Sequence, residues 1–113
     1  MNTVEILKNM VDTMTPENWQ KGRSFNADMT KACPMGHIDW ALGWSPGLKV
    51  DVVEMYLNAT EIAGIIVDQT GMEASATSDL VTFNDAKGTT FDDVYRAVRM
   101  AYEKELEKTN AYV

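Results

Sequence analysis

The stretch DVVEMYLNATEIAGIIVD, residues 51–68, decides the fold class. Asp51 and Glu54 have the spacing of a capping box, in which each side chain accepts a hydrogen bond from the free amide at the other end. Apolar side chains then recur every three or four residues, which predicts a helix with one buried face. That face comprises Val53, Tyr56, Leu57, Thr60, Ala63, Ile66 and Val67. An alternative prediction is a break near residues 58–60, after which Thr60 caps a separate helix.

Three other segments repeat this period and complete a helical fold. Residues 4–14 follow Thr3 as the N-cap, residues 34–42 start behind Cys33, and residues 91–108 follow a cap at Thr90. Side chains of these types satisfy the first backbone amides of a helix, and acidic residues favour its positive end. The prediction is an all-α fold. It is a single compact domain, residues 1–113, of four to five helices with at most a minimal short strand pair.

Between the helices, composition predicts irregular backbone. Residues 15–17 resemble a second cap that opens a short turn carrying Trp19. Residues 22–31 and 69–79 are polar or small and have no period, which predicts loops. Residues 80–83 form a short apolar run, which we interpret as an extended strap or half a strand, because four residues are too few for periodicity to decide.

Charge and cysteine content exclude several classes of protein. The 113 residues carry 17 acidic and 10 basic side chains, a net charge of −7, and residues 49–89 hold seven carboxylates against two lysines. Nucleic acid and anionic lipid repel such a chain, so we expect no direct contact with nucleic acid or membrane. The longest apolar run, residues 62–67, is too short to cross a bilayer, and residues 1–11 lack the pattern of a signal peptide. A single cysteine allows no internal disulfide, and we expect a cytoplasmic location.

Four short patterns follow one another along nearly the whole chain. They are Trp19-Gln20-Lys21-Gly22, Cys33-Pro34-Met35-Gly36-His37-Ile38, Phe83-Asn84-Asp85 and Thr90-Phe91-Asp92-Asp93-Val94. With them the chain resembles a family of small uncharacterised proteins of phages and bacteria that share W-x-x-G, C-x-x-G-x-Φ, Φ-N-D and T-x-x-[DE]-V, where Φ is apolar. The resemblance implies a phage context but no activity. At the position of His37 it implies a small residue such as alanine.

Cys33 and His37 are candidate catalytic residues. Four residues apart on a helix they share a face, and a helix N-terminus lowers the pKa of a thiol toward a reactive thiolate. A third group must orient the imidazole, but Asp39 points elsewhere and Asp85 would have to fold back. The alternative makes Cys33 a small buried side chain and His37 a surface or capping residue. Because Cys-x3-His is not a structural zinc spacing, we predict no metal site and no cofactor.

Two further groups of side chains are candidate binding residues. Asn84 and the third catalytic candidate, Asp85, are typical of side chains that hold turns, so we favour a structural role over acid–base chemistry or cation binding. Trp40 and Trp44 lie one helical turn apart, and with Trp19 and eight methionines they either fill the core or line an adaptable surface. The predicted binding residues are Trp19, Trp40, Trp44, Asn84 and Asp85.

Three functions remain in competition. The leading hypothesis is a non-catalytic protein-interaction module whose acidic middle complements a basic patch. In a phage context this patch belongs to a host factor or a defence protein. The alternative is a small enzyme that uses Cys33 with His37 or with Asn84 and Asp85. A weaker alternative is an acidic mimic of nucleic acid, for which −7 over the whole chain is modest. The sequence leaves the oligomeric state open.

Overall fold

The computed structural model describes residues 2–71 and 77–110, and their backbone is helical with irregular connections. Within these residues there is no strand, only two isolated bridges that join Ala32 to Trp19 and to Phe25. The all-α prediction is therefore confirmed. The helices in chain order are α1 (Thr3–Thr13), the 3-10 turn η1 (Pro16–Asn18), α2 (Pro34–Ala41), α3 (Val52–Asp68), α4 (Thr77–Asp85) and α5 (Phe91–Asn110).

The helix starts follow the local chemistry of the sequence. The Asp51 side chain accepts from the amide of Glu54 at 3.0 Å, and α3 then runs unbroken to Asp68, so the alternative break near residues 58–60 is wrong. Ahead of α5, Thr90 and Asp93 form a reciprocal capping box, with N···O distances of 2.9 and 3.2 Å. At the start of α1 the N-cap is Asn2 rather than the predicted Thr3.

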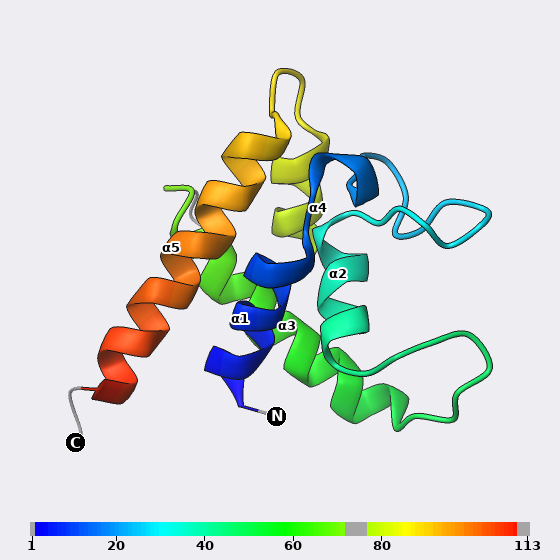
Figure 1. Cartoon of the computed structure of the whole chain (residues 1–113), viewed down its shortest axis with the longest axis horizontal. Coiled ribbons are helices and arrows are strands. Elements are labelled where there is room, and N and C mark those ends of the chain that lie inside the picture. Colours follow the sequence, from blue (N-terminus) through cyan, green and yellow to red (C-terminus); the bar gives the residue numbers. More distant parts are fainter. Residues whose placement is uncertain (1, 72–76, 111–113) are drawn as a thin grey trace.

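The five helices pack around one core (Figure 1). α1 lies along α5 and also contacts α2, while α3 crosses beneath them and packs against α4, α2 and α5. Tyr95 of α5 donates a hydrogen bond to the carbonyl of Val11 at 2.8 Å, which fixes α5 to the end of α1. The large side chains with no measurable exposure are Leu7, Met10, Ile38, Ile66, Val67, Leu80, Val94 and Val98.

The prediction for residues 80–83 is wrong, because they form a turn of α4 rather than an extended strap. Leu80 and Asn84 are both fully buried, and their four-residue spacing places them on one helix face, whereas Val81 and Thr82 are exposed. Packing on α3 selects the helix here, since four residues carry no period of their own. Residues 77–79, predicted as loop, also belong to α4, and the rest of that predicted loop after Gly71 lies outside the described residues.

Candidate functional site

Trp19 and Gly22 from the first sequence pattern bind Asn84 and Asp85 from the third. The indole N–H of Trp19 donates to Asn84 Oδ1 at 2.7 Å, and Asn84 Nδ2 donates to the carbonyl of Gln20 at 3.1 Å. Asp85 Oδ1 accepts from the amide of Gly22 at 2.8 Å. Asn84 has no exposed surface, and its amide group holds residues 19–33 against the end of α4. We call residues 19–33 the loop after η1.

The second pattern holds the other side of the same loop. A Cβ on Gly36 would lie 2.5 Å from the carbonyl oxygen of Ser24, so only glycine allows α2 to approach the loop this closely. His37 is buried, and its Nε2 lies 3.0 Å from the carbonyl of Asn18, to which the neutral ring donates. The expectation of a surface or capping histidine is therefore wrong. Burial lowers the pKa of His37 and keeps the ring uncharged.

Cys33 is the N-cap residue of α2, but it lacks the properties of an activated thiol. Its side chain is 5% exposed, and burial, followed by the charge of Asp85, raises its pKa. The helix-terminus effect expected from the sequence is thus outweighed by desolvation. Cys33 and Asp85 share a recess of only about 100 Å³, whose lining does not include Asn84. The three groups therefore do not converge on one substrate-sized cavity.

The tryptophans do not form one surface. Trp19 packs edge-on against Phe91, with the ring centroids 6.0 Å apart. α2 ends at Ala41, so Trp40 and Trp44 do not share a helix face as predicted. Their rings instead lie 5.1 and 5.0 Å from the ring of Phe25, which joins them. Of the three tryptophans, Trp44 lines an open cleft of about 440 Å³.

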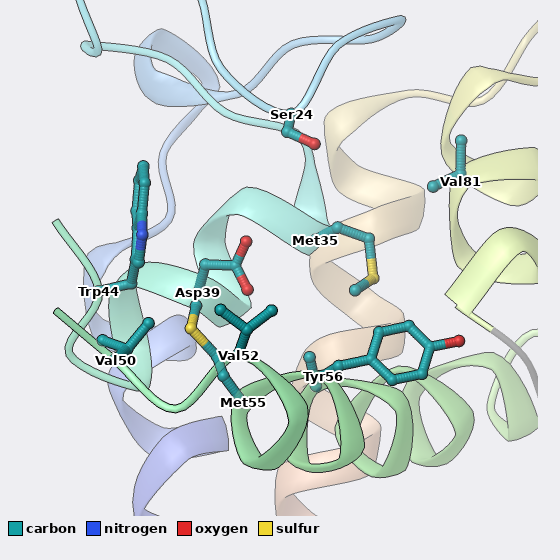
Figure 2. A pocket seen from close by; sticks show the side chains of 10 residues that line it. Ser24, Met35, Asp39, Trp44, Val50, Val52, Met55, Tyr56 and Val81 are labelled. Atoms are coloured by element: carbon teal, nitrogen blue, oxygen red, sulfur yellow. The ribbon is translucent and has the colours of Figure 1, made fainter. Parts of the chain in front are cut away.

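This cleft lies between α2, the first half of α3, α4 and the loop after η1, and its volume is about 440 Å³ (Figure 2). Its walls are mostly apolar, which suits a hydrophobic ligand group. A neighbouring hollow of about 240 Å³ shares Val50 and Met55 with the cleft and adds the carboxylates of Asp51 and Glu54. The lining residues of the cleft are Ser24, Met35, Asp39, Trp44, Val50, Val52, Met55, Tyr56, Ala59 and Val81.

Asp39 supplies the only charged side chain in this lining. Figure 2 shows its carboxylate in the middle of the cleft, with Trp44 on one side and Met35 on the other. Within the described residues it has no hydrogen-bond or ion-pair partner, and burial alone raises its pKa from 3.8 to about 6. The sequence analysis missed this residue. The available signal was its four-residue spacing from Met35, which places an acid on an apolar helix face.

The first two turns of α3 carry an uncovered apolar face. Val52 and Tyr56 lie in line with Ala59 and Ala63 at helical spacing, yet the first pair is 73% and 61% exposed while the second pair is buried. Beside them, Val53 and Leu57 are 69% and 61% exposed. The predicted buried face is therefore correct from Ala63 onward but wrong for Val53, Tyr56 and Leu57, because no helix within residues 2–71 and 77–110 covers these side chains. We call Val52, Val53, Tyr56 and Leu57 the α3 patch.

Residues 2–71 and 77–110 lack two other kinds of site. No three His, Cys, Asp or Glu side chains lie together in an arrangement able to hold a metal ion. No helix among them combines the length and the apolar character needed to cross a membrane.

Comparison with known proteins places the chain in a family. Residues 1–104 match a family of unknown function, DUF6197, so the chain belongs to that family. This agrees with the resemblance to an uncharacterised family inferred from the four patterns. No curated protein and no solved structure matches the chain.

Proposed function

We propose that this protein is a non-catalytic interaction module that binds a basic, amphipathic helix of another protein on the α3 patch. The proposal depends on one observation. The row of side chains that is buried at Ala59 and Ala63 continues along the same face of α3 to Val52 and Tyr56, where it is exposed. A contiguous exposed apolar face of this kind is typical of a binding surface. Amphipathic helices bind such faces through side chains spaced three and four residues apart.

Charge selects the partner. Asp39 lies in the cleft beside the α3 patch, and Asp51 and Glu54 line the neighbouring hollow. A second copy of this chain would bring the same carboxylates together, and each copy carries a net charge of −7. A helix with lysine or arginine beside its apolar face would meet complementary charge instead. In a phage context the partner would be a cytoplasmic host factor or defence protein.

The residues of the sequence patterns support a non-catalytic role. Asn84 and Asp85 are occupied in contacts with the loop after η1, and His37 contacts the carbonyl of Asn18 in η1 itself. Burial keeps the thiol of Cys33 protonated. These contacts explain the residue types without a reaction. The function is therefore assigned to the face of the molecule where apolar side chains and an unpaired carboxylate lack partners in the fold.

Site-specific photocrosslinking in the cells that express the protein tests the proposal. A photoreactive amino acid at position 56 should crosslink one partner, and sequencing of the crosslinked peptide should identify a basic amphipathic segment. The same amino acid at exposed Arg99 on α5 is the matched control. The double variant V53S/L57S should lose the crosslink but keep its thermal stability, because both side chains are mostly exposed. Equal crosslinking from positions 56 and 99, or none from position 56, would refute the docking proposal.

A further inference from the structure

Asp39 carries a partly buried carboxylate that has no protein partner in the described part of the chain. Its carboxylate is partly buried among apolar side chains, yet it receives no hydrogen bond and faces no cation. An unpaired carboxylate in such surroundings destabilises the fold, because ionisation there lacks the solvation that water supplies. A group of this kind is expected where a ligand supplies the missing partner.

The surroundings of Asp39 define the ligand. The walls of the cleft at Met35, Trp44 and Met55 are thioether and aromatic groups, which pack well against an alkyl chain. Trp44 additionally offers an aromatic face to a cation. A long alkyl chain that ends in a positive charge satisfies both features, since its stem contacts the walls and its head pairs with the carboxylate.

We propose that the Asp39 cleft binds the side chain of a lysine that projects from the apolar face of the partner helix. The inference rests on the proposed function, because the cleft and the α3 patch share Val52 and Tyr56 and one bound helix would contact both. Its ε-ammonium would donate to the Asp39 carboxylate inside the cleft. A lysine at this position would select one basic helix among many, since other partners would leave the carboxylate unpaired.

No other charged side chain of the described residues interferes with this pairing. The other polar groups in the lining are the hydroxyls of Ser24 and Tyr56. On α2, His37 is held against Asn18 and Trp40. The nearby carboxylates, Asp51 and Glu54, line the adjoining hollow and share the sign of Asp39. A bound ammonium would therefore stabilise ionised Asp39 and lower its pKa.

Two synthetic helical peptides of identical composition form the central test. Each has a leucine-rich apolar face and three lysines. In the first peptide one lysine lies in the middle of the apolar face, and in its isomer that lysine is exchanged with a residue of the polar face. Because net charge and composition are equal, a difference in affinity reports the position of one ammonium. Fluorescence anisotropy of labelled peptide measures the dissociation constants at pH 7.5.

We expect the native protein to bind the first peptide at least tenfold more tightly than the isomer. The D39N variant should bind both equally, whereas the matched control D68N, which changes an exposed carboxylate at the opposite end of α3, should preserve the difference. Carbon-13 NMR of the Asp39 carboxyl should also show its pKa falling when the first peptide binds. Equal binding of both peptides by the native protein, or a preference that survives in D39N, would overturn the lysine inference and leave the docking proposal intact.

Two other outcomes are decisive. If neither peptide binds at millimolar concentration, the docking proposal fails and the lysine inference fails with it. A third probe, n-butylammonium, tests whether a small free amine is the true ligand. If n-butylammonium shifts the Asp39 resonance at micromolar concentration, the ammonium group that binds the cleft comes from a small molecule. The assignment to a lysine of a partner protein is then overturned.

Discussion

Replacing Asp39 by asparagine should stabilise the isolated protein at neutral pH. The substitution keeps the size and shape of the side chain but removes the charge that burial disfavours. Most replacements of partly buried residues destabilise a fold, so a stabilising substitution here is a distinctive expectation.

The pKa of Asp39 sets the magnitude and the pH window. Burial raises this pKa from 3.8 to about 6, so the unfolded chain gives up the proton more readily than the folded one. The ionised carboxylate therefore costs little stability at pH 4, progressively more as the pH rises to about 6, and its full amount above pH 7. The full shift corresponds to about 3 kcal/mol at pH 7. Because the carboxylate is only partly buried and water screens its charge, D39N should recover about 1–2 kcal/mol.

Urea unfolding at pH 4, 5, 6 and 7.5, followed by circular dichroism, measures this effect. With a slope of about 1.5 kcal/mol per molar urea, the D39N midpoint should exceed the native one by roughly 0.7–1.3 M at pH 7.5, and by far less at pH 4. A D68N control should show no gain of this size, since Asp68 is exposed to water at the end of α3. If D39N is no more stable than the native protein at pH 7.5, or if the gain is the same at pH 4, the buried-carboxylate argument is wrong.

Three further substitutions or measurements test the contacts that hold the loop after η1. N84A should lower the free energy of unfolding in urea by about 2–4 kcal/mol, because it leaves the indole N–H of Trp19 without an acceptor and creates a cavity. A loss below about 1 kcal/mol would contradict the role of the Trp19–Asn84 hydrogen bond in holding the loop. G36A should cost about 2–3 kcal/mol, because its Cβ would meet the Ser24 carbonyl, and an unchanged melting temperature would show that the close approach is absent. The Cys33 thiol should react with a disulfide reagent at pH 8 much more slowly in the folded protein than in urea, and equal rates would disprove its protection.

The interpretation of the four sequence patterns changes with the structure. In sequence, Cys33, His37, Asn84 and Asp85 are the residue types from which catalytic sites are built. In the fold, Asn84 and Asp85 hold the loop across 63 to 65 residues of sequence separation, and His37 contacts a carbonyl 19 residues away. The spacing of residues within one helix does not predict hydrogen-bond partners that lie so far away in the sequence. The candidates were therefore found from the sequence, but their contacts were not.

The sequence alone determined what depends on near neighbours along the chain. The helical class, the caps at Thr15, Asp51 and Thr90, and the long helices α1, α3 and α5 follow from side chains that act within one turn. Tertiary structure decided what depends on distant neighbours. It made residues 80–83 helical, left the first turns of α3 uncovered, and enclosed Asp39 in an apolar cleft. The physical reason is that periodicity shows which side chains share a face, whereas burial depends on how far the packed helices extend over it.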